Sequence, residues 1–167
     1  MPVLSDSDIV RLLQNGSLRI EGYNERNLTP NGYDVTIEEI LVPSTGVKRK
    51  EGVVSVPGNS WFVIGTKESL ALPPNLMGQI WIRTTWVRRG VLSSFGIIDA
   101  GFNGNLTFSA YNASKDPVEV PIGERFAQVI FEELASPSKK SYAERSGNYQ
   151  GQRGITLEPT KGRRRGA

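Results

Sequence analysis

Short runs of β-branched and aromatic residues, each closed by Gly, Pro or Asn, follow one another through most of the chain. The clearest runs are 33–37, 53–56, 61–64, 79–82, 106–111 and 126–131. Runs of this length and composition are typical of strands. Many short strands separated by turns favour a β-sandwich, jelly roll or barrel over a parallel α/β sheet. The pattern therefore predicts an all-β fold of the distorted jelly-roll or β-clip kind.

The two ends of the chain depart from this pattern. Polar residues 5–8 precede the apolar residues of 9–13, which predicts a short capped N-terminal helix that ends near Asn15 and Gly16. From about Ser136 the alternation ends, and the Gly-rich stretch 147–154 predicts a flexible C-terminal arm. Such segments are usually disordered, and the alternative is an arm that orders over a ligand. Because no repeat or linker divides the chain, we expect residues 1–167 to form a single domain.

The chain contains neither cysteine nor histidine, and this limits its chemistry. Disulfides, the usual zinc ligands, thiol nucleophiles and imidazole bases are all excluded. Catalysis would have to use carboxylates, Lys or Arg, hydroxyls, backbone amides and a cation that prefers oxygen ligands, such as Mg²⁺. With no bilayer-length apolar run and no signal-peptide pattern, the sequence predicts a cytoplasmic protein without membrane partners.

The net charge of +3 owes much to a short basic tail formed by Lys161, Arg163, Arg164 and Arg165. A tail of this kind is usually a solvated chain end. The rest of the chain has no basic stripe interleaved with aromatic residues, which argues against a nucleic-acid partner.

Five blocks of sequence, in order, resemble the dCTP deaminase/dUTPase superfamily. They are Pro30 to Val35, Glu68 to Pro74, Ile82 to Gly90, Gly96 to Thr107, and Gly123 to Phe131, and Leu4 to Ile9 and Gly147 to Gly154 resemble the two ends of dCTP deaminases. The resemblance implies a homotrimer of distorted jelly rolls whose active sites lie at subunit interfaces. It also implies that the C-terminal arm closes over a deoxynucleoside triphosphate and that Mg²⁺ is the cofactor.

The resemblance assigns a phosphate-binding role to the segment around Arg83. Arg83, Thr84 and Thr85 would offer a guanidinium, two hydroxyls and backbone amides to the triphosphate, and Arg88 would lie near the nucleotide. Gln128 would contact the phosphates or a bound water. The alternatives are a strand-end surface arginine, ordinary β-strand threonines and a polar strand glutamine.

Two aspartates and a phenylalanine complete the implied catalytic set. Asp99 matches the dUTPase aspartate that activates the attacking water, although an Asp before Ala-Gly is also a common turn former. Phe102 would pack on the deoxyribose, or it is a core residue. Asp34 would hold Mg²⁺-bound waters in the outer shell or the sugar hydroxyl, or it bonds its own backbone. In the arm, Tyr142, Tyr149 and Gln152 are the candidate substrate-binding residues.

Two positions depart from the deaminase pattern. dCTP deaminases carry a glutamate ten residues after the aspartate of their Asp-x-Gly-Phe segment. Asp99 matches that aspartate, and the tenth residue after it is Ser109. Deamination without zinc needs a group that shuttles protons, which a serine hydroxyl without a base cannot do. Asn148 replaces a lysine of the deaminase arm, a charge that Arg145 or Arg153 would have to replace. The sequence therefore predicts a Mg²⁺-dependent dUTP nucleotidohydrolase, with dCTP deaminase or a non-catalytic deoxynucleotide-binding homologue as alternatives.

Overall fold

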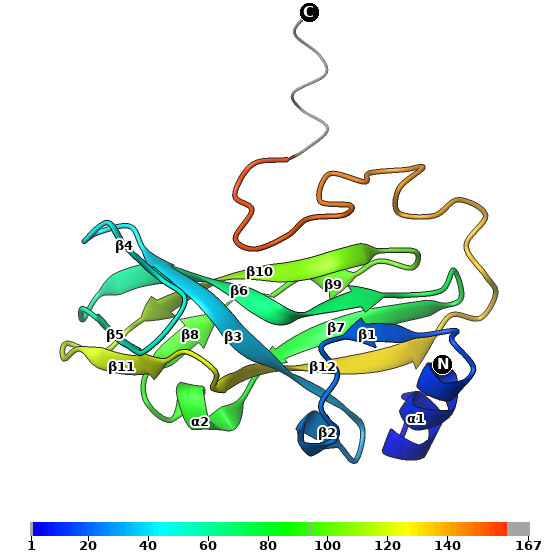
Figure 1. Ribbon diagram of the computed structural model, residues 1–167, viewed down its shortest axis with the longest axis horizontal. Coiled ribbons are helices and arrows are strands. Elements are labelled where there is room, and N and C mark those ends of the chain that lie inside the picture. Colours follow the sequence, from blue (N-terminus) through cyan, green and yellow to red (C-terminus); the bar gives the residue numbers. More distant parts are fainter. Residues whose placement is uncertain (1, 94, 160–167) are drawn as a thin grey trace, which may run out of the picture.

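The computed structural model describes residues 2–93 and 95–159, and strands dominate it (Figure 1). Helix α1 (Asp6–Gln14) comes first, and the short η1 (Glu25–Asn27) and α2 (Thr84–Val87) lie between strands. The strands are β1 (Arg19–Glu21), β2 (Leu28–Thr29), β3 (Gly32–Val42), β4 (Val47–Arg49), β5 (Val53–Val56), β6 (Ser60–Ala71), β7 (Leu76–Ile82), β8 (Val91–Ser93), β9 (Ile97–Ile98), β10 (Asn103–Asn112), β11 (Val118–Pro121) and β12 (Arg125–Glu133).

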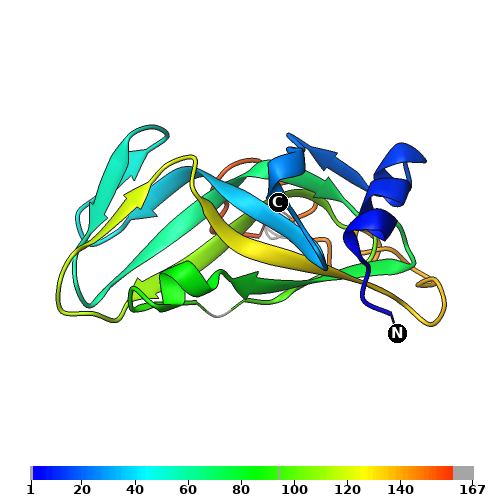
Figure 2. The same ribbon diagram turned by 90° about the horizontal axis from the view of Figure 1, so that it is seen from below.

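The strands pair antiparallel into one curled sheet and one small ribbon (Figure 2). The main path runs β8-β10-β6-β3-β12-β7-β9, with β1 added on β6 and with β2 and β4 added on β3, while β5 and β11 form the ribbon. The pairing register shifts between Asn105 and Thr107 in β10 and between Arg125 and Ala127 in β12. Such bulges increase twist and let long strands bend. The prediction of an all-β, distorted jelly-roll fold is confirmed.

The N-terminal helix forms as its capping residues predict. Ser5 accepts a hydrogen bond from the Asp8 amide, and the Asp8 carboxylate accepts one in return from the Ser5 amide. This capping box satisfies two amides that the first helical turn leaves without partners. Ile9 is fully buried against the sheet, and the helix is capped at Asn15, close to the predicted end.

Aromatic side chains from several strands meet around Phe126 of β12. Its ring lies 5.4 Å from Trp86, 6.3 Å from Phe62, and 6.4 Å from both Phe95 and Phe108, measured between ring centroids. Offset and edge-to-face aromatic pairs add stabilisation beyond their buried area. The cluster therefore joins α2, β6, β10 and β12.

Beyond β12 the described chain, residues 134–159, has no helix or strand and runs as a series of turns, of which residues 151–156 bond to β10. Figure 1 shows it as the orange and red segment above β10 and β9. The basic residues from Lys161 to Arg165 lie outside the described residues. In the part of the chain that the structure covers, no helix is long and apolar enough to cross a membrane.

Candidate active site

The loop between β9 and β10 borders a cavity of about 350 Å³. The turn is closed by the Phe102 amide, which donates to the Asp99 carbonyl at 3.0 Å. Gly101 has a φ of +82°, and a Cβ there would lie 2.8 Å from Ser141 of the arm. Glycine is therefore required both by the backbone conformation and by the close approach of the arm.

Side chains of mixed character line this cavity, which we call the hairpin cavity. Its lining residues are Ile80, Phe95, Gly96, Ile97, Ile98, Asp99, Phe102, Leu106, Thr107, Phe108, Ser109, Tyr142, Tyr149 and Gln152. Phe102 is buried and also faces the cavity, so the two roles considered for it from sequence are compatible. Asp99, by contrast, is exposed. An apolar pocket with a few convergent polar groups is the usual form of a small-molecule site.

The arm contributes one side of the hairpin cavity. The Tyr142 amide donates to the Ala100 carbonyl at 3.1 Å, and the Tyr142 ring packs edge-on against Phe102 with centroids 5.6 Å apart. Further along, the Tyr142 hydroxyl accepts from the Tyr149 amide at 3.0 Å. Gln152 is buried, and its Nε2 donates to the Asn105 carbonyl. All three arm residues predicted from sequence therefore lie beside Asp99 and Phe102.

Ser109 also lines the hairpin cavity. It is exposed on β10, and its carbonyl accepts from the Ser93 hydroxyl at 2.6 Å. Asp99 is the single carboxylate among the cavity's described lining residues. The position that matches the deaminase glutamate therefore lines the cavity, and in this chain it is a serine.

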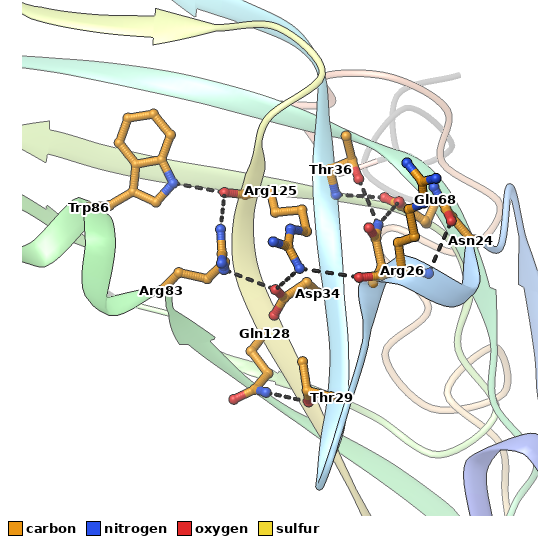
Figure 3. A network of polar contacts seen from close by, with 11 residues as sticks. Asn24, Arg26, Thr29, Asp34, Thr36, Glu68, Arg83, Trp86, Arg125 and Gln128 are labelled. Carbon is orange, nitrogen blue, oxygen red and sulfur yellow. Dashed lines mark hydrogen bonds and ion pairs between the residues drawn. The ribbon is translucent and has the colours of Figure 1, made fainter. Parts of the chain in front are cut away.

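A second group of predicted residues surrounds Asp34 on β3 (Figure 3). Asp34 is buried, and its Oδ2 lies 2.9 Å from Arg83 Nε and 3.3 Å from Arg125 Nη1. The Arg125 carbonyl in turn accepts from Arg83 Nη1 at 3.3 Å and from Trp86 Nε1 at 2.9 Å. Burial raises the pKa of Asp34, and the two guanidinium groups oppose that rise. We call Asp34, Arg83 and Arg125 the ion-pair cluster.

The ion-pair cluster is held by the junction of three elements. Arg83 follows the end of β7 and caps α2, so its side chain projects beside β12 and β3. Thr84, Thr85 and Arg88 belong to or follow α2 and are exposed. The threonines are therefore helical, contrary to the alternative of strand residues.

Gln128 pairs across the strands with Asp34, which places it next to the ion-pair cluster. Its Nε2 donates to the Thr29 hydroxyl at 2.6 Å. Arg89 lies 4.8 Å from the centroid of the Trp86 ring and donates to the Glu119 carbonyl, so it serves as a surface contact of α2.

Arg125 is a site residue that sequence reasoning did not single out. It lies within the block Gly123 to Phe131 that carried the family resemblance, and its charge at the start of a largely apolar run was a usable signal. Asn105, which bonds the arm and the β6 carbonyls, was also missed. A buried Asn in a strand has no sequence signature that separates it from an exposed one.

The structure divides the predicted residues into these two separate groups. No member of the ion-pair cluster, nor Thr84, Thr85, Arg88 or Gln128, lines the hairpin cavity. In Figure 1 the arm over the cavity lies along the top of the molecule, whereas α2 lies along the bottom. A single chain therefore does not bring Arg83 and Asp99 into one pocket.

The curled antiparallel sheet is the fold shared by dCTP deaminases and dUTPases. The 2′-deoxycytidine 5′-triphosphate deaminase of Agrobacterium tumefaciens matches with a TM-score of 0.66 and 18% identity over 80% of this chain, which spans about half of that chain (48%). The native dUTPase of EIAV matches with a TM-score of 0.54 and 22% identity over 77% of this chain and 98% of that one.

Sequence comparison gives the family. The family described as dCTP deaminase-like matches residues 43–134. A dCTP deaminase of Pyrococcus horikoshii is 40% identical over 85% of this chain and 90% of its own length. A probable deoxyuridine 5′-triphosphate nucleotidohydrolase of Sulfolobus islandicus rod-shaped virus 1 is 34% identical over 93% of this chain and 97% of its own. The chain belongs to the dCTP deaminase-like family, whose named members act on dCTP or dUTP.

Proposed function

We propose that this chain is a dUTP nucleotidohydrolase, which converts dUTP and water to dUMP and pyrophosphate. One observation carries the proposal. Among the described residues that line the hairpin cavity, Asp99 is the one carboxylate, while Ser109 occupies the position at which a deaminase would need its glutamate. Attack of water on a phosphate requires one side chain that accepts a proton. Deamination without zinc requires a side chain beside the cytosine ring that both accepts and donates protons.

Asp99 is the proposed general base. Its side chain is exposed, and no described residue makes an ion pair or hydrogen bond with its carboxylate, so the carboxylate can receive a proton. As the water oxygen bonds to the α-phosphorus, the bond to the α,β-bridging oxygen breaks, pyrophosphate leaves, and the water proton passes to Asp99. Phe102 and the arm residues Tyr142, Tyr149 and Gln152 would hold the deoxynucleoside and shield the site from bulk water.

The phosphates are assigned to the other group of residues. Arg83 is oriented by Asp34 and by the Arg125 carbonyl, and a fixed guanidinium suits phosphate oxygens. Thr84, Thr85 and Arg88 add exposed donors at the start and end of α2, and Gln128 lies on β12 opposite Asp34.

Assembly into a homotrimer would bring the two groups together. The hairpin cavity of one subunit would face the Arg83 region of a neighbour. An exposed apolar strip supports such an assembly, because Leu92, Tyr111 and Trp61 are in register on β8, β10 and β6 and are 41–54% exposed. Contiguous exposed apolar side chains on a sheet mark interaction surfaces.

The described residues are better suited to binding Mg²⁺ together with the triphosphate than to binding a metal ion by themselves. Among them, no three acidic side chains gather in a way that could hold a metal ion. Mg²⁺ keeps several waters and takes phosphate oxygens as ligands, so one outer-shell carboxylate, assigned to Asp34, suffices. When bound, the ion would neutralise part of the triphosphate charge.

dCTP deamination is the alternative, and the names of several relatives favour it, including the Pyrococcus horikoshii protein at 40% identity. It would require another carboxylate, such as Glu124, to do the work of the missing glutamate. A non-catalytic deoxynucleotide-binding protein is the third possibility. We place the enzyme in the cytoplasm on the basis of the sequence alone.

The test incubates the protein with dUTP and with dCTP in the presence of Mg²⁺ and measures pyrophosphate and ammonia. We expect pyrophosphate from dUTP and no ammonia from dCTP. Ammonia from dCTP would overturn the proposal in favour of the deaminase. Binding of dUTP without release of pyrophosphate would overturn it in favour of the non-catalytic protein.

A further inference from the structure

A carboxylate that belongs to neither group of site residues holds the end of the arm. Glu39 lies on β3, and its side chain is only 3% exposed. Its Oε1 accepts a hydrogen bond from the Ile155 amide in the arm, and its Oε2 lies 3.4 Å from Lys48 Nζ. Burying a carboxylate is costly unless charged or hydrogen-bonding partners compensate, so the arm amide is one of the groups that stabilise this buried charge.

Two glycines make room for the Glu39 carboxylate. Gly154 has a φ of +64°, and a Cβ there would lie 2.5 Å from Glu39 Oε1. Gly65, the cross-strand neighbour of Glu39 on β6, faces it from the other side, where a Cβ would lie 3.0 Å from Glu39 Cγ and 3.1 Å from the Ile155 amide nitrogen. A glycine in the sheet and a glycine in the arm thus both leave room for the Glu39 side chain.

The Glu39 contact is the far end of a continuous attachment of the arm to β10. The Gly151 amide donates to the Asn103 carbonyl at 2.7 Å, and the Asn105 amide donates to the Gln152 carbonyl at 3.1 Å. Next, Thr107 donates its hydroxyl to the Gly154 carbonyl. Gln152, which lines the hairpin cavity, is therefore fixed between the β10 contacts on one side and Glu39 on the other.

We propose that Glu39 is a positioning residue that keeps the arm closed over the hairpin cavity. The inference rests on the proposed function for the identity of the ligand, a deoxyuridine nucleotide, but not for the attachment itself. Releasing Ile155 would lower the fraction of molecules whose arm is closed, and the apparent dissociation constant rises as that fraction falls. Glu39 touches no group that reacts.

The experiment compares full-length wild type with Glu39→Ala, Glu39→Gln and the control Glu38→Gln, which removes a half-buried carboxylate one residue away on the same strand. Hydrogen exchange of the amides in residues 149–156 reports on the arm. Calorimetric titration with the α,β-imido analogue of dUTP reports on the ligand. Gly154→Ala acts from the arm side and leaves the sheet unaltered, so it gives the same test if Glu39→Ala does not fold.

We expect Glu39→Ala and Gly154→Ala to speed exchange in the arm and to weaken binding about tenfold, the usual worth of a hydrogen bond to a charged group. Glu39→Gln, whose amide oxygen still accepts from Ile155, should recover part of both losses, and Glu38→Gln should match wild type. Unchanged arm exchange, or faster exchange with wild-type affinity, would overturn the inference. A wild type that binds no deoxyuridine nucleotide would instead refute the proposed function, while the exchange data would still decide whether Glu39 holds the arm.

Discussion

Asp99 and Asp34 are the same residue type in opposite surroundings. Asp99 sits exposed at the hairpin cavity, and within residues 2–93 and 95–159 no side chain pairs with its carboxylate. Asp34 is buried and contacts two arginines. An unpaired carboxylate can take a proton, whereas a doubly paired one orients its partners. This difference is the basis for proposing Asp99 as the general base and Asp34 as a residue that orients Arg83.

The largest effect should come from removing the unpaired carboxylate. Asp99→Asn keeps the size of the side chain but cannot accept the water proton, so we expect pyrophosphate release to fall by about 10²–10⁴-fold. Binding of the α,β-imido analogue of dUTP should change little. Asp116→Asn, at an exposed aspartate of the loop between β10 and β11, is the control. Equal rates of pyrophosphate release in Asp99→Asn and wild type would show that Asp99 is not the general base.

The separation of the two regions predicts complementation between inactive variants. Asp99→Asn and Arg83→Ala should each be inactive alone. If one chain supplies Asp99 and its neighbour supplies Arg83, then after random reassembly of an equimolar mixture each of the two positions in a site is intact with a chance of one half. About one quarter of all sites should then regain both residues. The measurement is pyrophosphate release after the variants are unfolded together and reassembled. A mixture with no more activity than its components would place both residues in one chain's site.

A smaller effect should follow from loosening Arg83. Asp34→Asn removes the charge that holds two guanidinium groups, and we expect the KM for dUTP to rise about tenfold, as for the loss of a charge-assisted hydrogen bond. Glu38→Gln on the same strand serves as control. The roles considered for Asp34 make different predictions about Mg²⁺. Excess Mg²⁺ should restore the KM if Asp34 mainly holds metal-bound waters, and it should have no effect if Asp34 mainly orients Arg83.

Much of the fold could be predicted because its signals are local. The strand runs at 33–37, 61–64 and 126–131 and the capping residues of α1 all appear as expected. The pairing order β8-β10-β6-β3-β12-β7-β9 could not be predicted from these signals, since neighbours in the sheet are distant in sequence. The ordered path of the arm along β10 depends on such distant contacts too, through Asn105, Thr107 and Glu39.

The sequence named most of the residues that gather at the candidate site, but it did not show that they lie in two separate groups. Family resemblance named Asp99, Phe102 and the arm residues, and the structure gathers them at one cavity. It also named Asp34, Arg83 and Gln128, which gather elsewhere. A motif carries no information about which copy of the chain completes a site. Glu39 belongs to no motif, and it contacts Gly154 and Ile155, which are more than 100 residues further along the chain.

The smallest predicted effect concerns stability next to the ion-pair cluster. Glu68 is buried, and its carboxylate accepts from the Thr36 amide at 2.7 Å and from Asn27 Nδ2 at 3.3 Å (Figure 3). Burial raises the pKa of Glu68 above its ordinary value of 4.5, and the hydrogen bonds from Thr36 oppose the rise. The folded chain therefore binds the proton more readily than the unfolded chain does.

Linkage fixes the sign of the pH dependence. The stability that arises from the raised pKa of Glu68 is fully present below pH 4.5 and is lost as the pH rises through the folded-state pKa. Glu68→Gln cannot titrate, so its Tm should decline less than that of wild type over this interval, as measured by calorimetry between about pH 4 and about pH 8. Part of the decline should remain, because burial also raises the pKa of Asp34. A variant that loses as much Tm as wild type would mean that Glu68 is solvated in the folded protein, and Asp34 would then be the buried carboxylate that governs this region's response to pH.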